Sequence, residues 1–236
     1  MHFTDTPDAV RAWVHGWARS RGAGEPRPRP WGFTVTIGTP GNVMSHVLPT
    51  ADEATVRELT SGAAGPGVWL KAFVPADSLA AWIAPGWSLP AAPGSLMSTA
   101  LTAGSFRTPA PLPAGYRLRT WNHGGVVHAR VQTADGTTAA RGQTSVDGGT
   151  AVIDRVETHP AHRRRGLGRV IVVALGRAAA ERGATVGLLA STAEGRALYE
   201  ATGWEVAAPL ANALRGPSPA DAGERQRQRI GAATSR

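Results

Sequence analysis

The sequence contains no cysteine among its 236 residues. Without a thiol the chain can form no disulfide, no thiolate metal site and no cysteine nucleophile. It also contains no run of about 18 apolar residues, the minimum for a membrane-spanning helix. The first residues lack the basic and then apolar pattern of a secretory signal. We therefore expect a cytoplasmic protein with no membrane partner.

Lysine is almost absent too, because Lys71 is the only one, and arginine therefore carries nearly all of the formal net charge of +8. A basic chain favours anionic partners, which include nucleic acids, anionic membranes and phosphorylated cofactors, and net charge alone does not distinguish them. Hydrophobic residues make up 42% of the sequence, enough to bury a core in one large domain or two small ones.

Helix-like and strand-like segments alternate along the chain and predict an α/β fold. Residues 1–25 are predicted to hold an amphipathic helix that Thr6 caps and Gly22 ends, and the Pro-rich residues 25–30 an extended linker. Two α/β halves follow, at 31–106 and 113–210, with a Pro-rich boundary at 107–115. Residues 216–236 show no apolar periodicity, and we expect a disordered tail there.

The two halves resemble each other. Each reads as strand, helix, strand, helix, strand, and in each the second helix is followed by Gly-Trp, at 86–87 and at 203–204. A capping box of Thr50 and Glu53 is expected to start the first helix of the earlier half. Its tryptophans Trp69, Trp82 and Trp87 are expected to pack in the core rather than line an apolar pocket.

One stretch in the later half points to an anion site. A predicted strand at 151–158 leads into three consecutive arginines and then Gly166-Leu167-Gly168, where a helix begins. The first backbone N–H groups of a helix have no intrahelical partner, and the helix dipole makes this end positive. Arginines here oppose the dipole unless an anion lies between them, and the two glycines let a ligand approach the N–H groups. The pattern predicts a phosphate site.

The alternatives for this stretch are weaker. A solvated charge run does not require glycines at a strand–helix junction, and nucleic-acid binding would call for interleaved aromatic residues or a known module. Neither G-x-G-x-x-G nor G-x-x-x-x-G-K-[ST] is matched. His159 and His162 have no supporting carboxylates, and the arginines beside them repel a cation. We expect no nucleic-acid partner and no metal.

The run Arg163–Gly168 matches the R/Q-x-x-G-x-G/A signature and resembles that of the GNAT N-acetyltransferase superfamily. The strand before it closes in Thr158-His159-Pro160, and the segment "GRALYEATGW" after it is similar to the family's Leu-Tyr…Gly-aromatic segment. The resemblance covers about residues 113–210. It implies a GNAT-like acyltransferase fold, an α/β fold with a mixed sheet, in which residues 31–106 form a degenerate α/β half.

The resemblance also implies a function. It is the transfer of an acetyl group from acetyl-CoA (coenzyme A) to a primary amine of a small-molecule or peptide acceptor. The alternative is a non-catalytic coenzyme A-binding or interaction protein on the same scaffold. Tyr199 takes the role of the general acid that protonates the departing thiolate. Glu157, on the strand before the loop, is the candidate for the base, with Asp154 second.

For the cofactor, the resemblance implies that backbone amides of the arginine–glycine loop hold the pyrophosphate. Backbone groups of the preceding strand would pair with the pantetheine arm, and a backbone N–H there would polarise the thioester carbonyl. The residues assigned to coenzyme A are Val156, Thr158, Arg163, Arg164, Arg165, Gly166, Leu167, Gly168 and Arg169.

The chain also departs from the family pattern. The pair of helices that usually follows the first strand is missing, since 116–121 reaches 126–133 through only four residues. We expect the earlier half to supply that part of the acceptor wall. This half carries Asp52 and Glu53 where a second loop would need positive charge, so it should not bind a second acetyl-CoA. Thr192 stands where the family often has Asn, which puts part of the cofactor's anchoring in doubt.

Overall fold

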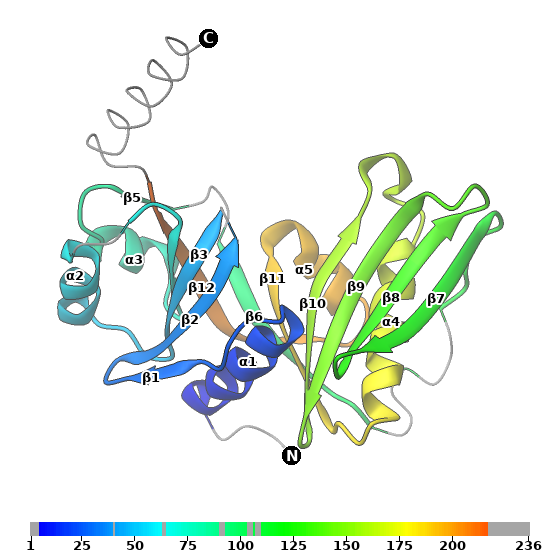
Figure 1. Cartoon of the computed structure of the whole chain (residues 1–236), viewed down its shortest axis with the longest axis horizontal. Helices are drawn as coiled ribbons and strands as arrows, with labels where there is room; N and C mark the ends of the chain where they lie inside the picture. The colour runs from blue at the N-terminus through cyan, green and yellow to red at the C-terminus, as the bar shows by residue number, and fades with distance from the viewer. Residues whose placement is uncertain are drawn as a thin grey trace, which may run out of the picture.

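The computed structural model describes residues 5–39, 41–62, 65–89, 93–102, 106 and 110–216. Nearly all of the predicted disordered tail lies outside these residues, as does part of the predicted boundary at 107–115. Figure 1 shows two lobes side by side, joined through the strands at the centre of the molecule. The first lobe contains β1–β5, α2 and α3, and the second contains β7–β11, α4 and α5.

All strands of the described residues belong to one 12-stranded mixed sheet with the order β1-β2-β3-β4-β12-β6-β11-β10-β9-β8-β7, and β5 pairs with β12 beside this path. The strands are β1 (Arg27–Arg29), β2 (Gly32–Thr39), β3 (Asn42–Leu48), β4 (Val68–Ala72), β5 (Trp87–Ser88), β6 (Gly94–Ala100), β7 (Tyr116–His123), β8 (Val126–Thr133), β9 (Thr138–Asp147), β10 (Thr150–Thr158), β11 (Val186–Thr192) and β12 (Glu205–Arg215). The helices are α1 (Thr6–Ser20), α2 (Glu53–Ser61), α3 (Ala76–Trp82), the short 3₁₀ helix η1 (Pro160–His162), α4 (Leu167–Ala180) and α5 (Ala193–Glu200).

The two lobes have the same order of elements. In the first, β3 and β4 are parallel and α2 connects them, and α3 follows; in the second, β10 and β11 are parallel, α4 connects them, and α5 follows. The strands β7 and β8 form a hairpin with continuous antiparallel pairing, so no helices lie between them. That one lobe is a degenerate copy of the other remains a prediction, which this shared order supports.

Two strands join the lobes. β6 follows the first lobe in sequence, yet it pairs with β11 of the second, from Val186↔Ala100 to Thr192↔Gly94. β12 pairs with β6 along its first part and with β4 along its last part. The sheet is therefore continuous across the molecule, and the Pro-rich boundary in the sequence does not divide it.

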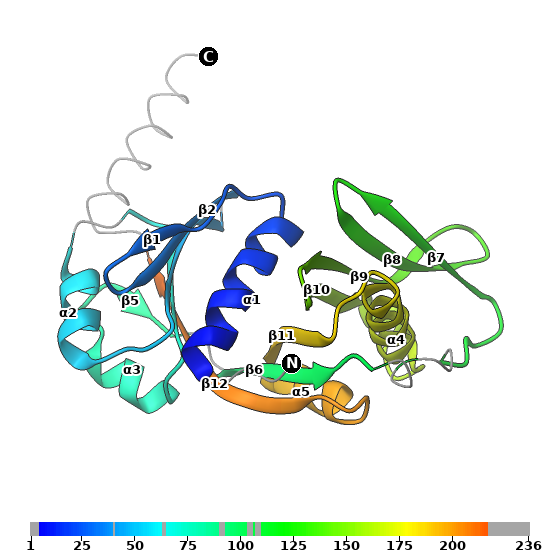
Figure 2. The same cartoon turned by 90° about the horizontal axis from the view of Figure 1, so that it is seen from below.

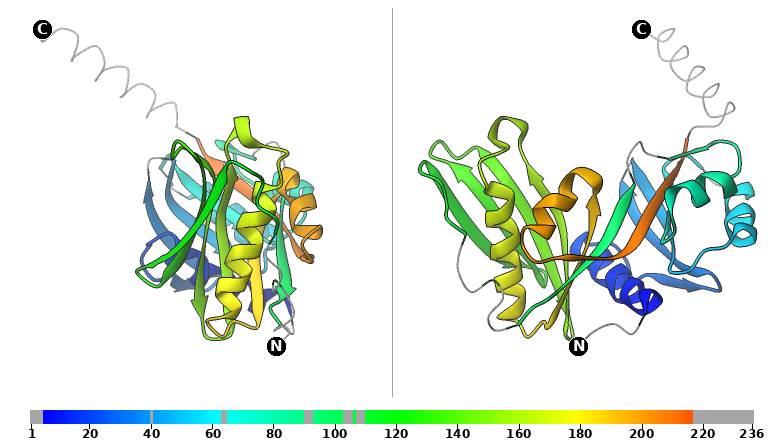
Figure 3. Two further views of the ribbon diagram at one scale, coloured as in Figure 1. Left: turned by 90° about the vertical axis from the view of Figure 1, so that its right-hand side faces the viewer. Right: turned by 180° about the vertical axis from the view of Figure 1, so that it is seen from behind.

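Helix α1 lies in the concave face of the bent sheet, between the lobes (Figure 2). Its indole rings of Trp13 and Trp17 stack at 5.2 Å, and both are nearly fully buried. They share a core with Val35 of β2, Val152 of β10 and Leu210 of β12. Burial of these large side chains stabilises the contact between the lobes by roughly 2 kcal/mol for each. The other helices cover the convex side, α2 and α3 on one lobe and α4 and α5 on the other (Figure 3).

Three local predictions were wrong. Asp5, not Thr6, caps α1, because its carboxylate accepts a hydrogen bond from the Asp8 N–H at 2.9 Å. Asp52 caps α2 in the same way through Thr55, in place of the predicted box of Thr50 and Glu53. The predicted linker contains β1, which pairs with β2 at the sheet edge, where a proline in a strand is tolerated.

Candidate active site

A β-bulge interrupts β10 just before the predicted phosphate loop. The register with β9 passes from Asp154↔Gln143 to Glu157↔Arg141, which leaves one extra residue on β10. Arg155 at the bulge has a positive φ of 53°. Gly142 lies opposite, and a Cβ there would be 2.6 Å from Cγ2 of Ile171 in α4. The missing side chain therefore lets α4 pack closely against the bulge.

Beyond the bulge β10 separates from β11. The parallel pairing starts at Thr150↔Val186 and ends at Ile153↔Leu189, although β10 continues to Thr158 and β11 to Thr192. The edge of β10 that faces β11 therefore has no strand partner over residues 154–158. Val156 and Thr158, predicted to pair with the pantetheine arm, lie in this segment. Such an unpaired edge can accept an extended ligand as an added strand.

The loop after β10 leaves a row of backbone donors open. Gly166 is the N-cap of α4 in the left-handed conformation, with φ of 77°, and the first helical hydrogen bond runs from the Val170 N–H to its carbonyl at 3.2 Å. The six backbone N–H groups of residues 164–169 donate to no backbone carbonyl of the described residues. A Cβ on Gly166 would meet nothing within 4 Å. The open helix end that the sequence predicts is present.

The two residues after Gly166 have a different environment. Leu167 is 1% exposed and packs in the core, so only its backbone faces the loop. A Cβ on Gly168 would lie 2.9 Å from Cδ2 of Leu198 in α5. The glycine at 168 therefore permits close packing between α4 and α5. The predicted close approach of a ligand fits the open space at Gly166 and not the space at Gly168.

The arginines of the loop surround its open end. Nε of Arg163 donates to the Thr158 carbonyl at 3.4 Å, and Nη1 of Arg165 donates to the Tyr116 hydroxyl at 3.0 Å. Arg169 turns to α5, where its Nη1 lies 3.5 Å from the Ala201 carbonyl. The side chains of Arg163, Arg165 and Arg169 are all exposed. Arg164, which has a positive φ of 62°, is exposed as well. All four charges therefore lie at the open helix end.

Tyr116 at the start of β7 was not predicted from the sequence as part of this site. Its hydroxyl lies 2.9 Å from Nδ1 of His162, and it also accepts the hydrogen bond from Arg165. A cavity of about 500 Å³ adjoins the loop. It is lined by Ala110, Pro111, Leu112, Pro113, Arg165, Gly166 and Arg169. The only signal in the sequence was that Tyr116 is one of just two tyrosines.

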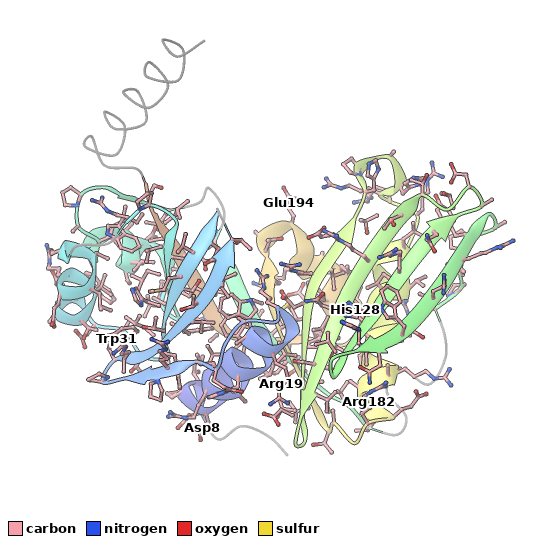
Figure 4. The ribbon with its side chains drawn as sticks, in the orientation of Figure 1. Asp8, Arg19, Trp31, His128, Arg182 and Glu194 are labelled. Atoms are coloured by element: carbon pink, nitrogen blue, oxygen red, sulfur yellow. The ribbon has the colours of Figure 1, made fainter. Side chains whose placement is uncertain are left out.

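The other tyrosine, Tyr199, is 8% exposed on α5. Its ring contacts Trp204 edge-on at 6.2 Å. Burial, with a smaller contribution from the charge of Asp154, raises the pKa of Tyr199 to about 12. The phenol therefore stays protonated at neutral pH and can donate a proton. Thr192 caps α5 through a hydrogen bond from the Gly195 N–H to its Oγ1 at 3.1 Å. Glu194 in the first turn points outward from this end (Figure 4).

The two candidate bases are both held by arginines. Oε2 of the half-exposed Glu157 accepts from Nη2 of Arg141 at 2.7 Å and from its Nε at 3.0 Å, while Oε1 is not part of either bond. Asp154 is 13% exposed, and both of its oxygens accept from Arg21, the C-cap of α1, at 2.7 and 3.0 Å. Ser20 adds a third hydrogen bond at 3.1 Å. Glu157 therefore keeps one oxygen for a proton, and Asp154 is more fully engaged.

Lys71 of β4 is a further charged residue that sequence reasoning did not assign to the site. Its Nζ donates to Oδ1 of Asn212 at 3.0 Å and lies 5.4 and 5.3 Å from the ring centroids of Trp17 and Trp69. Trp69 thus contacts a cation, whereas Trp82 and Trp87 pack in the core of the first lobe as predicted. Burial, and then the charge of Arg21, lowers the pKa of Lys71 to about 8.

Lys71→Met should stabilise the protein at pH 7 and flatten its stability profile at alkaline pH. Below pH 8 both the folded and the unfolded chain hold the proton, so the cost of burying the charge is fully present. Between about pH 8 and 10.5 the folded chain loses the proton first, so the free energy of unfolding of the wild type rises with pH. The gain at pH 7 should be about 1–3 kcal/mol. Urea denaturation at pH 7 and pH 10 measures both effects, and an equal rise in the two proteins would contradict them.

The described residues contain no group of three or more His, Asp or Glu side chains arranged to hold a metal ion. None of their helices is long and apolar enough to cross a membrane.

Comparison with known proteins identifies the fold. Residues 136–211, from just before β9 to within β12, match the family model described as FR47-like protein. The chain matches no curated protein at the similarity required of a relative. Among solved structures, a GCN5-related N-acetyltransferase from Kribbella flavida is 16% identical, with a TM-score of 0.60, over 92% of this chain and 98% of that one.

Two other solved structures are similar along nearly their whole length. A GNAT-family protein from Novosphingobium aromaticivorans is 21% identical with a TM-score of 0.56, over 92% of this chain and 100% of that one. A GCN5-related N-acetyltransferase-like protein from Streptococcus suis is 13% identical with a TM-score of 0.57, over 89% of this chain and 99% of that one. The predicted α/β GNAT-like fold is confirmed, and both lobes are covered by these matches.

Proposed function

We propose that this chain, which has the fold of the GNAT N-acetyltransferases, transfers an acetyl group from coenzyme A to a primary amine. The observation that supports the proposal is a combination of three structural features around the start of α4. They are the open row of N–H groups, the unpaired edge of β10 and the protonated Tyr199 on α5, and α4, β10 and α5 come close together at Gly168. We assign these features to the pyrophosphate, the pantetheine arm and the reacting thioester of an acyl-coenzyme A.

The residues present fit coenzyme A. Its pyrophosphate is anionic, and the loop offers six backbone N–H groups without a backbone acceptor among the described residues, the positive end of a helix and the guanidinium groups of Arg163 and Arg164. The open space at Gly166 and the adjoining cavity give room for a phosphate-bearing ligand. The amides of a pantetheine arm match the unpaired backbone of 154–158.

The side chains would then act on protons and charge. When bound, coenzyme A supplies an activated acyl thioester. A backbone N–H near Thr158 would donate to the oxygen on which negative charge develops. Tyr199, neutral because of its raised pKa, would donate its phenolic proton at the departing sulfur. Glu157 would take the amine proton at Oε1, directly or through water, because only Oε2 is occupied by Arg141.

Release of free coenzyme A thiol tests this function. Purified protein is given acetyl-CoA and a panel of primary amines, and the thiol is measured with a chromogenic disulfide. We expect amine-dependent release well above the rate of acetyl-CoA hydrolysis, together with an acetylated amine detected by mass spectrometry. Tight binding of coenzyme A without turnover of any amine would contradict catalysis and favour a non-catalytic coenzyme A-binding protein.

A further inference from the structure

A group of charged and aromatic side chains lies in the concave face where the two lobes meet. We call it the interlobe cluster; it consists of Trp17, Arg21, Trp69, Lys71, Asp154 and Asn212. Its members come from α1, β4, β10 and β12, elements of both lobes that the strand exchange brings together. Arg21 is the C-cap of α1, the helix that runs between the lobes in Figure 2.

Lys71 forms no ion pair with Asp154, the one carboxylate of this cluster, although the two charges interact at longer range. Among the described residues its Nζ forms a hydrogen bond only to the neutral amide of Asn212, and no carboxylate forms an ion pair with it. An ammonium has three donors, so two remain. The two indole rings at 5.3 and 5.4 Å stabilise the charge from the sides but accept no conventional hydrogen bond. Lys71 is only partly buried, so its two unused donors can bind an anionic ligand.

Arg21 has donors left as well. Its guanidinium lies 5.2 Å from the Trp17 ring centroid, and it uses Nε and Nη2 to hold Asp154. Nη1 takes no part in those two bonds. Two cations and one carboxylate leave the cluster with a net charge of +1 when Lys71 is protonated. A single negative charge would balance it, whereas a phosphate dianion would exceed it.

The cluster adjoins the place where the acyl group would be transferred. Asp154 is the first residue of β10 beyond the last pair with β11, so it stands where the two strands separate. Its charge also acts on Tyr199, the proposed proton donor, and on Lys71. Arg21, which is hydrogen-bonded to Asp154, therefore lies beside the start of the unpaired edge of β10, and Lys71 lies close enough for its charge to interact with that of Asp154.

We propose that the free donors of Lys71 and Arg21 bind a carboxylate of the acceptor, so that the acceptor class is a primary amine carrying a carboxylate. This rests on the proposed acyl transfer and deepens it by naming the substrate class. The indole rings of Trp17 and Trp69 and the amide of Asn212 fix the ammonium in position. The amine of the same molecule then points to the separated ends of β10 and β11.

Matched pairs of acceptors test the proposal. Amino acids and dipeptides are assayed as free carboxylates and as the corresponding carboxamides, which keep the amine and lose the negative charge. We expect the wild type to prefer the carboxylates by at least about tenfold in kcat/KM, the size of one charge-assisted hydrogen bond. Lys71→Met should abolish that preference by raising KM for the carboxylates, and Lys71→Arg should retain most of it.

Arg57→Met serves as the matched control, since Arg57 lies exposed on α2 and, among the described residues, pairs only with Glu53. It removes the same charge and should leave the preference unchanged. Equal use of carboxylates and carboxamides by an active wild type would overturn this proposal and leave the acyl transfer standing. An equal loss by Lys71→Met on both members of each pair would also overturn it, because Lys71 would then act on the amine they share. No turnover of any amine would contradict the proposed function, and this proposal with it.

Discussion

Reversing two charges of the loop together, Arg163→Glu with Arg164→Glu, is expected to weaken coenzyme A binding by at least about 100-fold. Both side chains are exposed at the open end of α4, and the neighbouring N–H groups of 164–169 have no backbone acceptor in the part of the chain that the structure describes. New carboxylates there would repel a pyrophosphate and compete with it for those donors. Isothermal titration with coenzyme A measures the change in Kd.

The control makes the same charge change at the other end of the same helix. Arg177 pairs with Glu181, and Arg182 follows the C-terminal end of α4, where Figure 4 labels it. Arg177→Glu with Arg182→Glu should change the affinity for coenzyme A less than threefold, a difference of about 0.6 kcal/mol. Similar losses in both double variants would show that net charge, and not the loop, governs binding. Thermal unfolding of each variant confirms that it is folded.

Tyr199→Phe is expected to lower kcat by about 100-fold or more, the usual contribution of a general acid, with an unchanged Kd for coenzyme A. The substitution keeps the ring and its edge-on contact with Trp204, so packing is preserved. It removes only the phenolic hydroxyl, and with it the proton to be donated. Because burial raises the pKa of Tyr199 to about 12, the wild type should lose no activity through this group between pH 7 and 10. Steady-state kinetics over that range check both statements.

Tyr116→Phe is the matched control for this loss of a hydroxyl. Tyr116 contacts His162 and Arg165 beside the loop, so its variant should raise the Kd for coenzyme A severalfold and leave kcat nearly unchanged. A large loss of kcat in Tyr116→Phe together with an unchanged kcat in Tyr199→Phe would overturn the role given to Tyr199. An equal kcat in the wild type and both variants would show that the rate is limited by product release, or that another group donates the proton.

Local signals in the sequence predicted the loop well. The strand, the glycine at 166 and the start of α4 depend on neighbouring residues, and the structure has them in the predicted places. Helix caps were predicted less well, because Asp5 and Thr6, or Asp52 and Glu53, compete at adjacent positions and only backbone geometry decides between them. The role of Gly168 was also not predicted from neighbouring residues. Its closeness to Leu198 depends on how α5 packs against α4.

Long-range pairing could not be predicted from these patterns. Nothing in residues 94–100 indicates that β6 pairs with β11, because the register depends on strands about 90 residues away. The interlobe cluster follows from that pairing: Lys71 and Asp154 are 83 positions apart, and α1, β4 and β10 meet only in the folded molecule. The rarity of lysine marked Lys71 as unusual without indicating its neighbours.

The position of β12 also bears on how the protein folds. This strand is the last described element of the chain, and it completes the hydrogen bonding of both β4 and β6. During synthesis, neither lobe can finish its sheet until residues 205–215 have left the ribosome. Until then one edge of β4 in the first lobe has no strand partner. Both partners of β6, which are β11 and β12, are also synthesised after it. Pairing over such sequence distances slows folding, so the two lobes should acquire their native structure together, after translation of the second.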